Sequence, residues 1–133
     1  MRRRSPEPGS PADWLRHARS DLIIAAKAAG PGVLRETLCF HCQQAAEKAV
    51  KAVLVLRQVE FPYTHNLARL ISLAQESNLG WPEELSEAAG LTRYAAELRY
   101  PGPSVEVTEE QYRLALRLAK DVVAWAASAV KSA

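Results

Sequence analysis

Apolar residues recur at helical spacing along almost the whole of this chain, and this pattern constrains the fold more than any other feature. They return every three or four residues, and no segment shows the sustained polar–apolar alternation of a half-buried strand. Hydrophobic residues make up 48% of the 133 residues, which is sufficient for one core but short for two domains. The pattern therefore predicts an all-α protein with a single domain.

Capping residues and helix breakers predict where the helices begin and end. Ser10 followed by Pro11 is typical of a helix start, and Thr108 with Gln111 has the spacing of a capping box. Thr64 is expected to be the N-cap of a third helix. The expected helices span residues 10–29, 34–57, 64–76, 82–99 and 108 to about 130. Short connections favour antiparallel neighbours, so we predict an antiparallel up-and-down bundle of four long helices plus one short helix.

The segment 34–57 is apolar on more than one side. Phe40, Val50 and Val55 add apolar surface outside its main stripe. A helix of this kind is central in a bundle or is shared with a second subunit. We therefore expect this helix in the middle of the fold, and we expect a homodimer.

The ends and the charge of the chain restrict its class. Residues 1–10 contain prolines and three arginines without a hydrophobic pattern, which predicts a flexible basic N-terminal tail before a helical domain over residues 11–133. A formal net charge of +2 excludes the strongly basic signature of a sequence-independent nucleic-acid coat. The sequence shows no membrane-spanning run, no signal peptide and only two cysteines, so the expected location is cytoplasmic.

The two cysteines form a C-x-x-C pattern at Cys39 and Cys42, which is compatible with a redox pair or with half of a zinc site. A redox pair normally lies at a helix start beside a sheet, whereas these residues fall inside a predicted helix. A closed zinc site needs two more ligands, and the histidines lack the spacing to supply them. We interpret both cysteines as small core residues and expect no bound metal.

A polar stripe follows one face of the segment 34–57. The stripe consists of His41, Gln44, Lys48 and Lys51, at positions i, i+3, i+7 and i+10. This pattern allows two interpretations. One is a solvated face with Glu47 and Lys51 as an i,i+4 ion pair. The other is the polar wall of a groove that binds phosphate or a partner.

Two further segments could carry function. His65 falls in the first turn of the expected third helix, where its ring can face a neighbouring element or belong to a turn that fixes the entry of the helix. Arg99 ends the expected fourth helix before Tyr100 and Pro101. A semi-buried arginine there needs a carboxylate, helix carbonyls or a phosphate.

The chain has no P-loop and no evident pair of acid and base carboxylates, and we expect no cofactor.

Three segments in this order resemble the HEPN domain family (higher eukaryote and prokaryote nucleotide-binding). They are residues 40–52 (Phe-His-Cys-Gln-Gln-Ala-Ala-Glu-Lys-Ala-Val-Lys-Ala), residues 64–67 (Thr-His-Asn-Leu) and residues 99–101 (Arg-Tyr-Pro). The resemblance covers about residues 12–131. It implies a helical bundle that is often a homodimer. Many bacterial and archaeal members are partners of a minimal nucleotidyltransferase, often as a toxin–antitoxin pair.

Many proteins of this family are metal-independent RNases, in which an arginine is followed four to six residues later by a histidine. The histidine helps to activate the ribose 2′-hydroxyl, and the arginine steadies the phosphate. In this chain Arg99 stands at the position of that arginine, but no histidine occurs after His65. The general acid/base is therefore missing at its expected position, and we expect a protein that is not an enzyme or is only weakly active.

Taken together, the residues and the resemblance predict a HEPN protein that serves as the partner or substrate-binding subunit of a minimal nucleotidyltransferase and as a nucleotide- or RNA-binding module of a toxin–antitoxin system. The expected binding residues are Arg99, Tyr100, Lys48, Lys51, Gln44, His41 and His65, with Arg99 as the catalytic candidate. Two alternatives remain open. One is a metal-independent HEPN endoribonuclease that uses Arg99 and a displaced base, and the other is a homodimeric bundle whose polar stripe is only structural.

Overall fold

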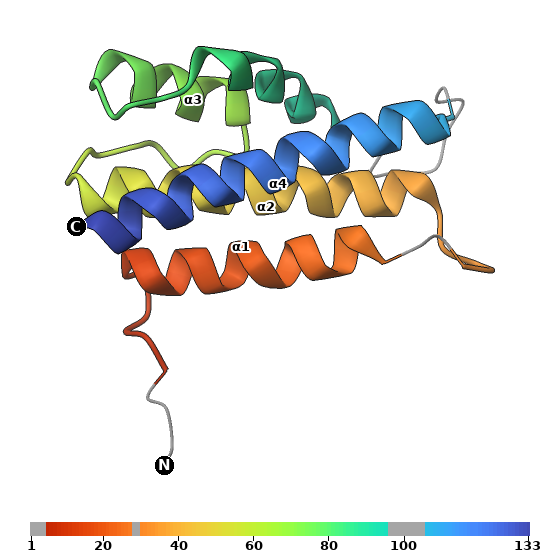
Figure 1. Cartoon of the computed structure of the whole chain (residues 1–133), viewed down its shortest axis with the longest axis horizontal. Coiled ribbons are helices and arrows are strands. Elements are labelled where there is room, and N and C mark those ends of the chain that lie inside the picture. Colours follow the sequence, from red (N-terminus) through yellow and green to blue (C-terminus); the bar gives the residue numbers. More distant parts are fainter. Residues whose placement is uncertain (1–4, 28–29, 96–105) are drawn as a thin grey trace.

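The computed structural model describes residues 5–27, 30–95 and 106–133, and this part of the chain forms five helices and no strand. The helices are α1 (Pro11–Ala26), α2 (Arg35–Leu56), α3 (Leu67–Glu76), the 3-10 helix η1 (Glu83–Ala95) and α4 (Glu109–Ser132). They pack side by side in a bundle (Figure 1), which confirms the predicted all-α fold. In Figure 1, α2 runs opposite to α1 and in the same direction as α4.

Two helix starts follow the capping pattern of the sequence. The Ser10 side chain accepts a hydrogen bond from the Asp13 backbone N–H, and Pro11 occupies the first turn of α1. At α4 the Thr108 hydroxyl accepts from the Gln111 N–H, while the Gln111 side chain accepts from the Thr108 N–H. Both halves of the predicted capping box are therefore present.

The start of α3 differs from the prediction. The N-cap is Asn66, whose side chain accepts from the Arg69 N–H, and Thr64 instead accepts from the Asn66 N–H in the turn before the helix. The turn before the helix is also tied to α2, because the His65 carbonyl accepts a hydrogen bond from the Gln43 side chain. Asn is a stronger N-cap residue than Thr, and the N-cap of α3 falls two residues later than expected.

The η1 helix is wound with three residues per turn, and its sequence suits that winding. Leu85, Ala88, Leu91 and Tyr94 are buried and lie three residues apart. Side chains at i and i+3 eclipse one another in a 3-10 helix, so this spacing keeps all four on one face. Thr92 also accepts a hydrogen bond from the Ala68 N–H at the start of α3. The last part of the expected fourth helix, residues 96–99, lies outside the described residues.

The central position predicted for α2 is confirmed. This helix contacts α1, α3, η1 and α4, and 13 of its 22 residues are buried. Ala52 and Leu54 lie on opposite sides of the helix and are both fully enclosed by the single chain. Of the three residues behind the expected homodimer, Val50 is fully buried, whereas Phe40 and Val55 are partly exposed, and the homodimer stays a prediction. Among the described residues no helix has the length and apolar character needed to cross a membrane.

Candidate binding site

Four polar side chains lie in the interior of the bundle among the apolar residues of the core. Asp21 of α1 and Gln43, Glu47 and Lys51 of α2 are each at most 8% exposed. Burying a charged or polar group is unfavourable unless hydrogen bonds and opposite charges compensate for the lost water. The partners of these four side chains therefore define a polar network on the side of α2 that faces α1 and the segment before α3.

The first part of the network joins α1 to α2 through Asp21. One carboxylate oxygen, Oδ1, lies 2.9 Å from Nδ1 of His41, and the other, Oδ2, accepts from Nζ of Lys48 at 2.6 Å. A carboxylate can only accept, so Nδ1 of His41 carries the hydrogen in this pair. The side chains of His41 and Lys48 are both 24% exposed, so this part of the network reaches the surface.

The second part of the network surrounds Glu47. Its carboxylate accepts from Nζ of Lys51 at 3.0 Å, from the amide of Gln43 at 3.0 Å and from Nδ1 of His65 at 3.1 Å. The predicted Glu47–Lys51 pair is therefore present, but it is buried, and the solvated face expected for it is wrong. The Lys51 ammonium also lies 5.3 Å from the ring centre of Trp14 and 5.8 Å from that of Phe61.

Gln44 joins the second part of the network through Gln43. The Gln44 amide donates to the Gln43 side-chain oxygen at 2.7 Å, and Gln43 in turn donates to Glu47 and to the His65 carbonyl. The structure thus brings together five of the seven residues expected from the sequence. The other two, Arg99 and Tyr100, lie outside the described residues.

Sequence reasoning missed Asp21 and Gln43, although a signal for each exists. Asp21 falls three residues after Ala18 and four before Ala25, so it interrupts the apolar stripe of α1. Gln43 falls four residues after Cys39 and three before Ala46, also on an apolar face. A polar residue at a buried position needs a partner, and this rule identifies both residues as members of a network.

Both histidines present a second ring nitrogen beyond the network. Among the described residues, Nε2 of His41 and Nε2 of His65 have no hydrogen-bond partner. The His65 side chain is 49% exposed, and the ring of Tyr63 meets it edge-on with 5.7 Å between ring centres. A carboxylate on Nδ1 fixes the orientation of each ring and leaves Nε2 able to accept a proton or to bind a phosphate oxygen once protonated.

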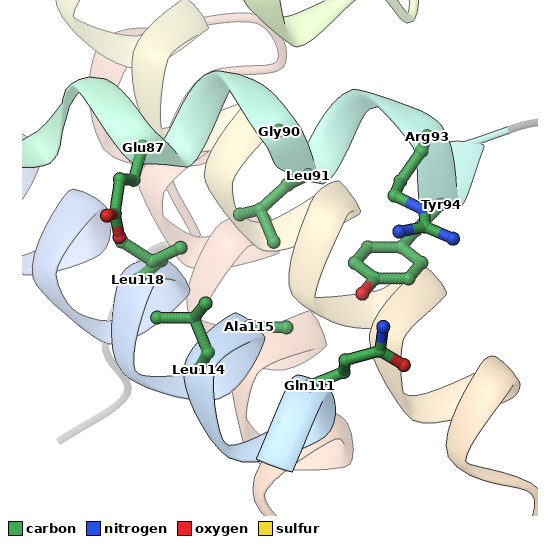
Figure 2. Close-up of a pocket in the computed structure, with 9 residues that line it drawn as sticks. All are labelled: Glu87, Gly90, Leu91, Arg93, Tyr94, Gln111, Leu114, Ala115 and Leu118. Carbon is green, nitrogen blue, oxygen red and sulfur yellow. The ribbon is translucent and has the colours of Figure 1, made fainter. Parts of the chain in front are cut away.

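A separate pocket of about 280 Å³ lies between η1 and α4 (Figure 2). Its lining residues are Glu87, Gly90, Leu91, Arg93, Tyr94, Gln111, Leu114, Ala115 and Leu118. Much of this lining is apolar, and several of its polar side chains are engaged with the protein: Arg93 stacks on Tyr94, and Gln111 belongs to the capping box of α4. The polar network is therefore the stronger candidate for a binding site.

The two cysteines are core residues, as expected from the sequence. Both are fully buried, and burial raises the pKa of the Cys39 thiol to about 11 and that of Cys42 to about 12. Thiolates are the nucleophilic and metal-binding form, so both thiols are in their unreactive form at neutral pH. Within the described residues, no group of three or more histidine, cysteine, aspartate or glutamate side chains is arranged to hold a metal ion.

The family model of the HEPN domain matches residues 11–130, and the chain belongs to this family. Two solved structures share the fold over nearly their whole length. TT1696 from Thermus thermophilus has 30% sequence identity and a TM-score of 0.76, with 91% of this chain and 98% of that chain covered. ST0689, an archaeal HEPN homologue, has 27% identity and a TM-score of 0.70, with 90% and 96% covered. Among curated protein sequences none matches significantly.

The buried pair of Glu47 and Lys51 gives a direct test of the network. We expect Glu47→Gln to lower the free energy of unfolding by about 3–5 kcal/mol, because it leaves the Lys51 ammonium buried without a counter-charge. Glu109 and Arg113 form a pair with the same i,i+4 spacing and a similar distance, but it is exposed. Glu109→Gln is the matched control and should change stability by less than about 1 kcal/mol. Urea denaturation measures both, and equal losses would contradict the role given to burial.

The raised thiol pKa values predict how stability depends on pH. In the unfolded chain a thiol ionises near its ordinary pKa of 9.0, whereas Cys39 and Cys42 stay protonated to about 11 and 12 in the folded state. Above pH 9 the unfolded state therefore binds fewer protons, and the free energy of unfolding falls as pH rises toward 11. Denaturation between pH 8 and 11 should show a shallower fall for Cys39→Ala/Cys42→Ala than for the wild type. Identical slopes would show that the thiols do not contribute.

Proposed function

We propose that this protein is a nucleotide-binding HEPN subunit that acts with a separate minimal nucleotidyltransferase. The observation that carries the proposal is the pair of anchored histidines, His41 and His65. Each ring is held through Nδ1 by a buried carboxylate, while Nε2 has no partner among the described residues. In the protonated imidazole Nε2 is a donor, and a donor that is already held in place at the surface suits a phosphate group because it needs little reorganisation on binding.

The charge of the network favours an anionic ligand. Lys48 and Lys51 balance Asp21 and Glu47, so protonation of either histidine gives the network a net positive charge. Lys48 is partly exposed and can contact a phosphate directly, whereas Lys51 is enclosed by Trp14, Phe61 and Glu47. In this proposal Lys51 holds Glu47 in place, and His41, Lys48, His65 and Gln44 form the contact surface for the nucleotide.

The partner enzyme extends the proposal from the ligand to an assembly. Three segments of the sequence resemble HEPN proteins that are encoded beside minimal nucleotidyltransferases, and the missing histidine after Arg99 favours a binding role over an RNase role. The same resemblance supports a toxin–antitoxin setting, in which the nucleotidyltransferase is the second component. Arg99 and Tyr100 are proposed to extend the binding surface.

Nucleotide binding can be measured by calorimetry with ATP as the probe. We expect His41→Gln and Lys48→Gln each to weaken ATP binding at least about tenfold, because each removes one charge-assisted hydrogen bond to phosphate. Lys120→Gln, at an exposed position of α4, removes the same charge outside the network and should leave the affinity unchanged. Affinity purification from the native cell should also recover a minimal nucleotidyltransferase in stoichiometric amount. Absence of both ATP binding and such a partner would contradict the proposal.

One observation favours the endoribonuclease as a second candidate. A histidine whose Nδ1 donates to a carboxylate is the arrangement of a general base, and the structure contains two such pairs, His41–Asp21 and His65–Glu47. A base displaced from the usual position after Arg99 could therefore come from α2 or from the turn before α3. This candidate requires a substrate ribose within hydrogen-bond distance of one Nε2 atom.

Assays with a labelled single-stranded RNA separate the two candidates. We expect no cleavage above the buffer rate, because a positioned general acid/base typically contributes about 10²–10⁴-fold and none follows Arg99 in the sequence. Rapid cleavage that disappears in Arg99→Ala and in either His41→Gln or His65→Gln would identify the protein as an endoribonuclease with a displaced base. His17→Gln, on the exposed side of α1, is the control for these histidine substitutions.

A further inference from the structure

A shallow groove crosses the end of the bundle where the N-terminal half of α1 lies beside the C-terminal end of α4 (Figure 1). It consists of two adjoining hollows of about 620 and 510 Å³, which share Ala12 and Arg19 as lining residues. One hollow lies between α1 and the segment before it, where Ser5 and Pro6 are lining residues, and the other lies between α1 and α4. We refer to the two together as the α1–α4 groove.

The lining of this groove combines apolar surface with positive charge. Ile23 is 63% exposed, and Val130 and Ala12 add further apolar atoms. Three cations line the groove: Arg16, Arg19 and Lys131. No carboxylate is among the lining residues of either hollow. Arg16 is paired with Asp13 at its edge, whereas Arg19 and Lys131 have no ion-pair partner within the described part of the chain.

We propose that the α1–α4 groove docks an acidic amphipathic helix of a partner protein. An apolar ridge at i, i+3, i+4 and i+7 of such a helix would cover Ile23 and Val130, and carboxylates on its flanks would meet Arg19 and Lys131. The proposal rests on the proposed function in taking the partner to be a protein. It adds the surface on which that partner docks and the chemistry of its docking element.

Other occupants fit the groove less well. A nucleic acid needs a denser set of cations and gains from aromatic stacking, and no aromatic side chain lines either hollow. A membrane surface is matched by protruding apolar residues, whereas this surface is recessed. A two-fold dimer through the groove would bring two identical linings together, each with three cations and no carboxylate, so that like charges repel.

The test uses the full-length protein and two fluorescein-labelled synthetic peptides. Each peptide forms about five helical turns with leucines at i, i+3, i+4 and i+7. The first has glutamates on the flanks of the leucine ridge, and the second has lysines at the same positions. We expect anisotropy to show binding of the glutamate peptide, at least about tenfold weaker binding of the lysine peptide, and a loss of affinity as NaCl is raised.

Substitutions locate the binding site. Arg19→Glu and Ile23→Ser should each weaken binding of the glutamate peptide at least about tenfold. Arg117→Glu makes the same charge reversal as Arg19→Glu on α4 outside the groove, and it should change affinity by less than about twofold. Thermal melting of each variant verifies that the fold is retained, as expected for positions outside the buried core.

Four outcomes would overturn the inference. The first two are equal binding of the two peptides and no binding of the glutamate peptide at about 1 mM. The third is an equal loss of affinity in Arg19→Glu and Arg117→Glu. The fourth is that the protein binds no peptide but shows Arg19-dependent binding of poly(U) RNA, of phosphatidylserine vesicles or, in sedimentation, of a second copy. The peptide assay involves neither ATP nor a nucleotidyltransferase. Peptide binding without ATP binding or a co-purifying enzyme would therefore contradict the proposed function alone.

Discussion

The burial of Glu47 is the constraint on which the arrangement of the first three helices depends. A carboxylate that is 2% exposed needs hydrogen-bond donors around it, and α2 alone supplies only Lys51 and Gln43. The third donor is His65, which comes from the turn before α3. The need to satisfy one buried charge therefore ties that turn to α2 and holds a histidine at the surface.

Asp21 fixes the position of α1 against α2 in a similar way. Its two oxygens accept hydrogen bonds from His41 and Lys48 of α2. These contacts fix the relative position of two antiparallel helices whose other contacts include many small apolar residues. Small side chains allow close packing but specify sliding and rotation poorly. Directional contacts to a carboxylate specify both. Because the two histidines and Lys48 are held by these carboxylates, the interactions that align the helices also prepare the surface that we propose for nucleotide binding.

The position of α2 explains why its two-sided apolar character does not by itself require a dimer. α1, α3, η1 and α4 all pack against this helix, and together they cover most of its apolar surface, although Phe40 and Val55 stay partly exposed. Ile23 of α1, in contrast, is an apolar residue that the chain leaves exposed, and it lines the same hollow as Arg19. The surface that we propose for a partner therefore lies on α1 and α4, where unmatched charge and apolar surface occur together.

The sequence by itself determined the helical class, the caps at Ser10 and Thr108 and the central place of α2. It also determined that His41, Gln44, Lys48 and Lys51 share one face. These features depend on local spacing and on short-range hydrogen bonds. Only the tertiary structure decided that Asp21 and Glu47 lie between those cations and the histidines. It also decided where the turn before α3 lies, since the carbonyl of His65 accepts a hydrogen bond from a side chain 22 residues away. Pairing between distant elements leaves no periodic trace in the sequence, and it appears there only as a polar residue on an apolar stripe.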